Sequence, residues 1–596
     1  QHDMSLIFLD VETFSNYWGC AFLRDDGKRI MISMTPTRPL DIEKLRAVVY
    51  SGATFVGFNS LHYDIPMVAA ALAGRDNAEL KALSDRIIGS QMKAWQHKDL
   101  RMPDVDHVDI METTPGVQIG LKLYGGRLHA KTLQDLPFKP DDVLTDAQID
   151  ELEAYNWNDV EITRLLHSTL TDALALRVDI GKQIGVDLRS KSDAQMGEAI
   201  IRAAVEKELG GKLPKPVSRA GDVFAYQPPV WLSFTDPMLQ GVLRDVCDAD
   251  FVVKDDGAVQ LPQAMKRVVK FDGGAYRMGI GGLHSSEKRQ HVAATVDTLL
   301  IDRDVASYYP NLIIQCGMSP EATGGHFQAV YRGIVARRME AKRDKARANE
   351  AQGLKIAANG TFGKLGSRYS FLYAPELLIQ VTVTGQLALL MFIERITAAG
   401  ARVVSANTDG VVFKCPVGRL DAVNAAIAEW ERTTGLETEA TRYTDVWSRD
   451  VNAYVARKLD GKFKLKGPVA NRSVDAVDHM HNPDAEIVTD AALAWLADGA
   501  PIERTIRSCR DIRKFVTVRR VTGGAVLDGA PVGKIVRWYA AVDRFAPMRY
   551  ITTSNKVPGS DGAKPVMVLP DEFPSDVRYG KYVADTIALL NGIGAV

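Results

Sequence analysis

The sequence predicts an α+β protein of several domains. The chain has 596 residues, which is too many for one hydrophobic core. Its apolar fraction of 46% and charged fraction of 25% are ordinary for a globular protein. Short apolar runs typical of buried strands alternate with longer amphipathic stretches typical of helices. We therefore expect both kinds of element along the whole chain.

The composition indicates a cytoplasmic protein with no membrane partner. No uninterrupted apolar stretch of about 18 residues is present, and the first residues lack the pattern of a signal peptide. The five cysteines are scattered without a CxxC pair, which argues against zinc and disulfides and for a reducing compartment.

Positive charge is concentrated in two stretches although the net charge is only −1. Residues 332–347 hold seven Lys and Arg against two acids, a net charge of +5. Residues 504–520 hold seven against one, a net charge of +6. Such stretches suit local binding of a polyanion, although each one taken alone is more typical of a solvated helix face.

The N-terminal third contains acids at the ends of separate predicted elements. Residues 5–13 predict a strand that places Asp10 and Glu12 on one side. Residues 56–59 predict a second short strand, which turns into a helix over residues 65–72, and Asp64 lies near the start of that helix. A helix over residues 151–166 places Tyr155 and Asp159 one turn apart. Four carboxylates and a tyrosine are what hydrolysis of a phosphodiester with two metal ions needs.

This ordered set resembles the three exonuclease motifs of proofreading DNA polymerases, which have an RNase H-like fold. The resemblance implies that the four acids bind metal ions and that the tyrosine helps to position the attacking water. Asp109 follows another apolar run and is either a supporting acid or a structural residue. The residues that carry the resemblance are Asp10-x-Glu12, Asn59-x4-Asp64 and Tyr155-x3-Asp159.

In the second half, two more acids follow predicted strands. Residues 298–305 predict a buried strand with Asp302 and Asp304 on one face. Two apolar β-branched runs flank Asn407-Thr-Asp409-Gly and predict a β-hairpin with Asp409 at its tip. Residues 278–284 are rich in glycine and predict a turn between strands. The glycines either let the backbone approach another chain closely or form a plain flexible turn, and the two interpretations are equally good.

Basic helices lie between these acids in the sequence. A helix over residues 329–350 carries Arg338 and Lys342 on one face, and Gly353 is expected to end it. A second helix then places Lys355 on the same face as Asn359 and Phe362. Three cations could converge on a triphosphate, which favours nucleotidyl transfer between metal-bound carboxylates and a nucleotide.

These motifs resemble those of family B DNA polymerases, particularly the compact viral kind. Asp304-x2-Ser-Tyr-Tyr309-Pro, Lys355-x3-Asn359-Gly-Thr-Phe-Gly and Asn407-Thr-Asp409 occur in the order of that family. The resemblance implies that Asp304 and Asp409 bind metal, and that Tyr309 lies under the sugar of the incoming nucleotide. It also implies that Arg338, Lys342 and Lys355 hold the triphosphate and that Asn359 lies under the nascent base pair.

Several residues depart from the family pattern. Asn407 replaces an acid, Phe362 replaces a tyrosine and Gly360 replaces a serine. The segment Asn452-Ala-Tyr454 resembles a primer-gripping Lys-x-Tyr motif with asparagine in place of lysine. Lys464 and Lys466 alternate onto one face of a predicted strand and are candidates to share the DNA contact, together with Tyr454.

The resemblance implies a domain order. An RNase H-like 3′–5′ exonuclease domain (1–170) and a connecting region (171–297) precede a right-hand polymerase. The polymerase consists of a palm (298–328 and 369–470), a fingers hairpin (329–368) and a thumb with the C-terminal region (471–596). From the second basic stretch on, the similarity fades, and a generic C-terminal cap is the alternative.

The expected function is DNA-directed DNA synthesis with 3′–5′ proofreading, in replication of viral DNA. The expected cofactors are two Mg²⁺ ions per site, with Mn²⁺ as a substitute. The expected partners are primer–template DNA and dNTPs, and the chain is expected to be monomeric. The intervals between motifs are too short for the insertions of protein-primed members, so an ordinary 3′-hydroxyl is the expected primer. One alternative is an exonuclease with a degenerate polymerase site, suggested by Asn407 and Asn452. Another is a replication scaffold that binds primer–template without chemistry.

Overall fold

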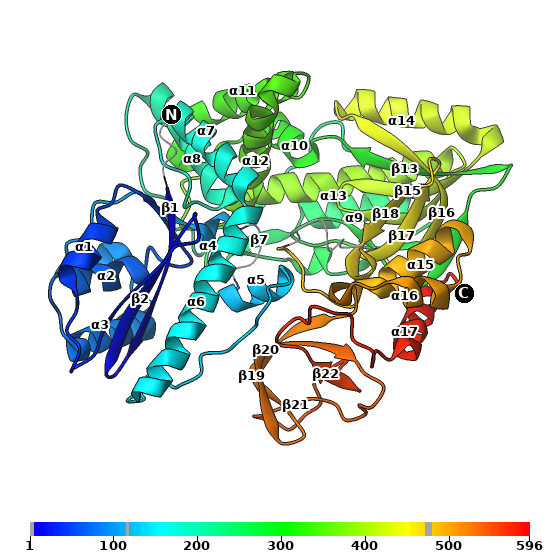
Figure 1. The fold of residues 1–596 in the computed structure, drawn as a ribbon. Coiled ribbons are helices and arrows are strands. Elements are labelled where there is room, and N and C mark those ends of the chain that lie inside the picture. Colours follow the sequence, from blue (N-terminus) through cyan, green and yellow to red (C-terminus); the bar gives the residue numbers. More distant parts are fainter. Residues whose placement is uncertain (1–4, 115–118, 471–478) are drawn as a thin grey trace. The chain divides into compact units, whose positions relative to one another are not determined.

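The computed structural model describes residues 5–114, 119–470 and 479–596 (Figure 1). Helices and strands are mixed throughout, and the chain divides into two compact units. Unit 1 comprises Gln1–Ser192, Arg472–Ala491 and Pro501–Val583, and unit 2 comprises Asp193–Asn471, Ala492–Ala500 and Ala584–Val596. The expectation of an α+β chain with more than one core is confirmed. The finer domain boundaries stay predictions.

Unit 1 is built on a five-stranded sheet in the order β3-β2-β1-β4-β5. Its central strand β1 pairs antiparallel with β2 and parallel with β4. Alternate residues of β1 enter two cores: Ile7, Leu9 and Val11 pack in one cluster and Phe8 in another. The strands are β1 Leu6–Phe14, β2 Tyr17–Arg24, β3 Arg29–Met34, β4 Thr54–Gly57 and β5 His107–Asp109.

Helices of unit 1 follow the sheet strands and supply much of both cores. The capping box of Asp76 and Glu79 fixes the start of α3, and Thr145 with Gln148 does the same for α6. The helices are α1 Ile42–Val49, α2 Asp64–Leu72, α3 Asn77–Ser90, α4 Ile110–Thr113, α5 Leu121–Arg127, α6 Asp146–Thr169 and α7 Thr171–Ile184.

The C-terminal part of unit 1 contains a second sheet in the order β21-β19-β20-β22. The basic stretch 504–520 is not one helix: it runs from α16 (Ile502–Ser508) into β19 (Thr517–Leu527). Phe515, between them, is buried against Phe573 and Tyr582. The remaining strands are β20 Ala530–Ala540, β21 Arg549–Tyr550 and β22 Ala563–Pro565. Two helices contribute residues to both units, α15 Glu486–Asp498 and α17 Tyr579–Gly592.

Unit 2 is built on a ten-stranded sheet in which β13 lies between β15 and β16. This central position satisfies the backbone of β13 on both sides and lets its side chains point into the two faces of the sheet. The strands are β9 Val268–Phe271, β10 Gly274–Arg277, β11 His284–Ser285, β12 Gln290–Ala293, β13 Thr298–Val305, β14 Arg402–Asn407, β15 Gly410–Pro416, β16 Thr438–Asp450, β17 Ala453–Lys458 and β18 Phe463–Lys466.

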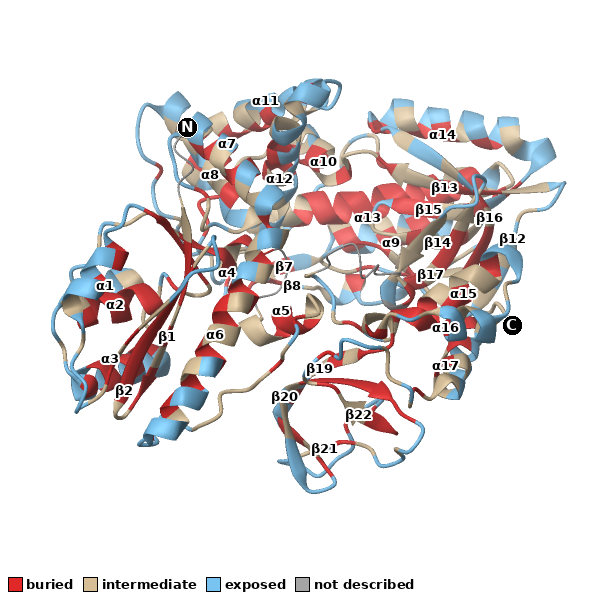
Figure 2. Cartoon of the chain, viewed as in Figure 1, coloured by how far each residue is buried: buried red, intermediate tan, exposed pale blue. Residues whose placement is uncertain are grey.

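The core helix of unit 2 is α13 (Pro375–Ala398), which is red along most of its length in Figure 2. Its composition and length would suit a membrane span, but 83% of its most apolar stretch is buried inside the unit. Trp430 of α14 (Leu420–Thr434) donates a hydrogen bond to Ala388 O of α13 at 3.1 Å. The helix α10 (Tyr308–Cys316) also packs on α13.

The expected basic hairpin forms, but its turn is not where the sequence suggested. The first helix, α11 (His326–Ala341), ends before Lys342, and α12 (Ala348–Leu365) begins before Gly353. Asp344 caps the intervening turn by accepting from Ala346 N at 2.9 Å. Gly353 is buried inside α12. The expected break at Gly353 was therefore wrong, because a glycine in a packed helix costs only about 1 kcal/mol.

The connecting region holds more structure than its loops suggested. The helix α8 (Asp193–Leu209) packs on α11 and α12. The sequence did not indicate this third helix. A small sheet follows, together with one further helix: β6 Val223–Ala225, α9 Pro237–Cys247, β7 Asp250–Val253 and β8 Val259–Gln260.

Candidate active sites

The first site lies in unit 1, where three elements bring the predicted acids together. Asp10 and Glu12 are on β1, and Asp159 is on α6. Ligand oxygens of these three residues lie within 4.8 Å of one another. Asp64, the first residue of α2, joins them through its carboxylate, which accepts a hydrogen bond from Val11 N at 2.7 Å. The strand β1 therefore supplies two of the acids, and the backbone of the residue between them holds the carboxylate of Asp64.

Burial and mutual repulsion make this cluster electrostatically costly without a cation. Burial, with the Asp159 charge, raises the pKa of Glu12 to about 8. Burial also raises the pKa of Asp64 to about 7 and holds those of Asp10 and Asp159 above their usual range. Carboxylate oxygens are the ligands that Mg²⁺ and Mn²⁺ prefer. This donor set therefore fits a divalent metal centre.

Two residues of this site were not predicted from the sequence. Lys122, on α5, donates to both carboxylate oxygens of Asp159 at 2.7 and 2.8 Å. Its ammonium also lies 3.9 Å from the ring centroid of Tyr155. Asn156 donates to Asp10 Oδ2 at 3.1 Å. Asn156 could have been predicted from its position next to Tyr155. No sequence pattern links Lys122 to Asp159, 37 residues further along the chain.

Asp109 holds the loop that leads to Asp64. Its carboxylate accepts from Asn59 N at 2.9 Å and from Leu61 N at 3.0 Å. Asn59 has a φ of 57°, in the left-handed region, and these bonds support that turn. Of the two interpretations of Asp109, the geometry supports the structural one.

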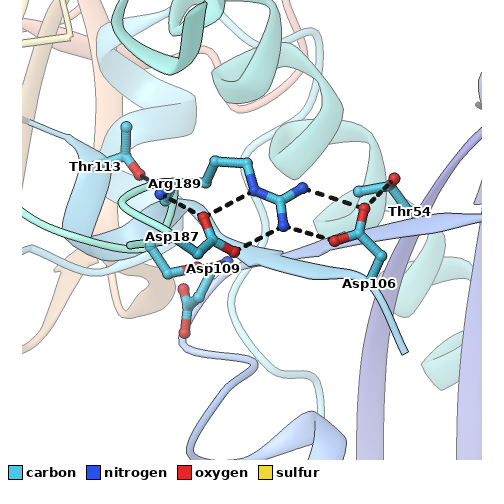
Figure 3. Close-up of polar contacts among 7 residues, drawn as sticks. Thr54, Asp106, Asp109, Thr113, Asp187 and Arg189 are labelled. Carbon is cyan, nitrogen blue, oxygen red and sulfur yellow. Dashed lines mark hydrogen bonds and ion pairs between the residues drawn. The ribbon is translucent and has the colours of Figure 1, made fainter. Parts of the chain in front are cut away.

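An arginine network fixes the strand that carries Asp109 (Figure 3). Arg189 binds both carboxylate oxygens of Asp106, at 2.6 and 3.1 Å, and also pairs with Asp187 at 2.7 Å. Thr54 donates to Asp106 at 2.5 Å, and Thr113 donates to the carbonyl of Arg189 at 2.6 Å. The network therefore ties Thr54, the first residue of β4, to Asp106, the residue before β5.

The second site lies in unit 2, where the hairpin of β14 and β15 meets β13. Asp304 pairs in register with Gly410, the residue after Asp409. A Cβ at Gly410 would lie 2.1 Å from Asp304 Oδ1, so only glycine fits beside this carboxylate. Val305 N donates to Asp409 O at 2.7 Å and closes the hairpin tip on β13. The predicted hairpin with an acid at its tip is confirmed.

A cavity of about 350 Å³ contains both acids of this site. Burial, with the Asp302 charge, raises the pKa of Asp304 to about 6, and burial raises that of Asp409. Among the described residues, these acids do not form a three-ligand cluster as tight as that of unit 1. Two carboxylates on one cavity wall still suit a divalent ion. The other polar lining residues are Gln290, Asp302, Ser405, Asn407, Tyr443, Ser448, Tyr454, Lys464 and Lys466.

Asp302, which was predicted to share a face with Asp304, also lines the cavity of this site. It is 3% exposed and accepts from Tyr443 Oη at 2.5 Å and Lys464 Nζ at 3.0 Å. The same ammonium lies 3.7 Å from Asp304 Oδ2. Burial lowers the pKa of Lys464, but Asp302, Tyr454, Asp304 and Tyr443 together outweigh it, and the net shift of the pKa is upward. Lys464 is therefore a fixed cation between two carboxylates.

The DNA-contact candidates share the same wall. Tyr454 of β17 pairs in register with Lys466 of β18, and both line the cavity with Lys464. Asn452 is exposed in the turn between β16 and β17. Asn407 lines the cavity too, and its backbone pairs with His284 of β11. The predicted turn before β11 is confirmed.

A second cavity of about 260 Å³ adjoins Asp409 and collects the nucleotide-binding candidates. Tyr309, Arg338 and Asn359 line it. Phe362 lines it as well, with its ring centroid 4.6 Å from that of Tyr309. The Tyr309 hydroxyl donates to Gly281 O, in the glycine-rich turn. Asp409 lines both cavities and therefore connects the carboxylates with this group.

The expected convergence of three cations is only partly seen. Arg338 lines the second cavity and donates to Ser307 Oγ at 3.4 Å. Lys342 and Lys355 are exposed and line neither cavity. Since α11 ends at Ala341, Lys342 lies at the start of the turn and not on the helix face. Their role toward a triphosphate stays a prediction.

Comparison with known proteins identifies no family. No protein-family model matches the chain, and no characterised protein matches it in sequence. Among solved structures, it is similar to the family B DNA polymerase from the hyperthermophilic archaeon Pyrobaculum calidifontis. The TM-score is 0.42 at 15% identity, over 100% of this chain and 78% of that one. So low a TM-score carries no argument about function. Any functional proposal has to come from the geometry of the two sites.

Proposed function

We propose that the chain is a DNA-directed DNA polymerase of the family B type with a 3′–5′ proofreading exonuclease. The observation that supports synthesis most directly is the position of Asp409. It lines a cavity with Asp304, Lys464 and Lys466 and a second cavity with Tyr309 and Arg338. Carboxylates for metal and residues for a nucleotide are thus adjacent within one unit.

The residues of the second cavity suit a deoxynucleotide. The Tyr309 ring, held by Phe362 and by its bond to Gly281 O, offers a flat surface for a sugar. Arg338 supplies a guanidinium for phosphate oxygens. Bound at Asp304 and Asp409, two Mg²⁺ or Mn²⁺ ions would activate the primer 3′-hydroxyl and neutralise the phosphates. Geometry would supply most of the rate, as in other phosphoryl transfers.

The cluster in unit 1 suits hydrolysis of a DNA 3′ end. Asp10, Glu12, Asp64 and Asp159 would hold the divalent ions. The Tyr155 hydroxyl, whose pKa is raised by burial and by the Asp159 charge, stays protonated and can orient a water molecule. Replication of a viral genome, with primer–template DNA and dNTPs as substrates, is the biological setting that we propose.

Primer extension and single-strand degradation by the same protein test both activities. Asp304→Ala and Asp409→Ala should abolish synthesis and leave degradation intact. Asp10→Ala should do the reverse. Asp421→Ala, which removes an exposed acid of α14, is the control. Unchanged extension by both Asp304→Ala and Asp409→Ala would disprove the polymerase assignment.

Asn407 motivates one rival, an exonuclease whose polymerase site is degenerate. Asn407 lines the cavity of Asp304 and Asp409 at the position where the resembled Asp-Thr-Asp motif has an acid, so this cavity has one negative charge fewer. No dNTP incorporation with Mg²⁺ or Mn²⁺, together with metal-dependent degradation of single strands, would favour this rival.

A further inference from the structure

Unit 1 carries an exposed tryptophan beside the loop that leads to its acidic cluster. Trp95 is 74% exposed, in a short turn, Ala94–Gln96, between α3 and β5. A single exposed apolar side chain is ordinary, but a tryptophan this exposed leaves a large flat ring in water. The ring is available for stacking.

The turn is anchored to the loop that leads to Asp64. Ala94 N donates to His62 Nδ1 at 3.2 Å, and the rings of His62 and Trp95 meet edge to face at 5.7 Å. Lys93 N donates to Gln96 Oε1 at 2.6 Å and closes the turn. His62 lies two residues before Asp64, in the loop that Asp109 fastens. The tryptophan is therefore fixed to the element that positions a predicted metal ligand.

The charge around Trp95 suits a polyanion. Lys93, Lys98 and Arg101 are exposed, and none of them forms an ion pair with an acid in the part of the chain that the structure describes. The one acid among them, Asp99, is already paired with Arg75 at 2.8 Å and Arg86 at 3.6 Å. A flat aromatic ring among uncompensated cations is the combination by which proteins bind single-stranded nucleic acid.

We propose that Trp95, with His62 and these cations, forms a stacking platform for the single strand that enters the acidic site of unit 1. The platform would stack one base on the indole ring and contact the neighbouring phosphates through the lysines. This inference rests on the proposed exonuclease, because the strand is taken to lead to its acids. The ligand is a single-stranded DNA with a free 3′ end.

Binding and degradation of fluorescein-labelled oligo(dT) by the full chain provide the test. Binding is measured by anisotropy in EDTA, so that it needs no catalysis. Since stacking of one base is worth about 1–3 kcal/mol, Trp95→Ala should weaken binding by roughly fivefold or more. Trp95→Phe should restore most of the loss. Tyr50→Ala removes another exposed aromatic ring of unit 1, 58% exposed, and should bind like the parent.

Two further readouts separate this platform from the catalytic assignment. Trp95→Ala should raise the KM for degradation more than it lowers kcat, and Lys93→Ala with Lys98→Ala should make binding less steeply dependent on salt. Unchanged binding and KM in Trp95→Ala would overturn the platform while the parent still degrades DNA. If the parent binds through Trp95 but never degrades DNA, the exonuclease fails and the platform stands. Equal losses for oligo(dT) and oligo(U) would extend the ligand to RNA.

Discussion

Replacing Lys464 with methionine should destabilise unit 2, because it leaves the Asp302 carboxylate buried without its cation. The two charges are 3.0 Å apart, and Asp302 is 3% exposed. At an effective dielectric constant of about 20, their attraction is roughly 5 kcal/mol before desolvation is subtracted. Breaking a buried pair typically costs about 3–5 kcal/mol. The Lys464 side chain is 38% exposed, so screening reduces the expected cost to about 2 kcal/mol.

Removing the carboxylate and keeping the lysine should cost much less stability. Asp302→Asn keeps an acceptor for the Tyr443 hydroxyl and leaves Lys464 beside Asp304, 3.7 Å away and partly in water. We expect a loss below about 1 kcal/mol. The double variant removes both charges and should resemble Asp302→Asn alone. This asymmetry distinguishes a buried carboxylate from a generic loss of packing.

Hydrogen exchange of β13 and β18 peptides measures the effect locally, without assuming that the whole chain unfolds in one step. A loss of about 2 kcal/mol should speed exchange roughly thirtyfold in Lys464→Met. Lys466→Met, two residues along the same strand, is the matched control, since it removes a lysine that forms no ion pair among the described residues. Equal effects of the two lysine variants, or additive effects in the double variant, would refute the reasoning.

Three other predictions concern Gly410, His107 and Asn407. Gly410→Ala should lower synthesis about 100-fold by displacing the Asp304 carboxylate, whereas Gly418→Ala, with open space around it, should not; single-strand degradation should be unchanged in both. Burial lowers the pKa of His107 from 6.5 to about 4, so its contribution to stability is complete above about pH 6.5 and is lost as the pH falls toward 4. His107→Asn should therefore reduce the fall in the free energy of unfolding of unit 1 between pH 7.5 and pH 5, measured by urea denaturation, by about 2 kcal/mol; an equal fall in the variant would contradict this. Asn407→Asp should lower the Mg²⁺ concentration needed for half-maximal extension, and an unchanged requirement would show that position 407 does not face the ions.

Local patterns predicted which acids share a face, because the periodicity of strands and helices alone fixes this placement. Asp10 and Glu12 on β1 follow from a period of two, and Tyr155 and Asp159 on α6 from a period near four. The turn residues between two apolar runs likewise predicted the hairpin around Asp409.

The missed contacts join residues that are distant in the sequence, and no local pattern encodes them. Lys122 meets Asp159 from another helix, and Lys464 meets Asp302 from 162 residues away. The end of α11 was missed for a related reason. Glycine is the stronger breaker in isolation, but the side chain of Asp344 caps the turn, while Gly353 is retained inside a packed helix.

Asp302 offers a physical reason why Asn407 can stand where the resembled motif has an acid. The cavity of unit 2 already holds three carboxylates, those of Asp302, Asp304 and Asp409, against the ammonium groups of Lys464 and Lys466. A fourth carboxylate at position 407 would add repulsion that no further lysine of this cavity offsets. The strands β13 and β14 flank β15, and Asp302 of β13 lines the same cavity as Asn407 of β14. The negative charge that is absent at position 407 is therefore present at position 302. The site therefore keeps its carboxylates although position 407 is an asparagine, and Asn407 does not imply that the site has lost its catalytic charge.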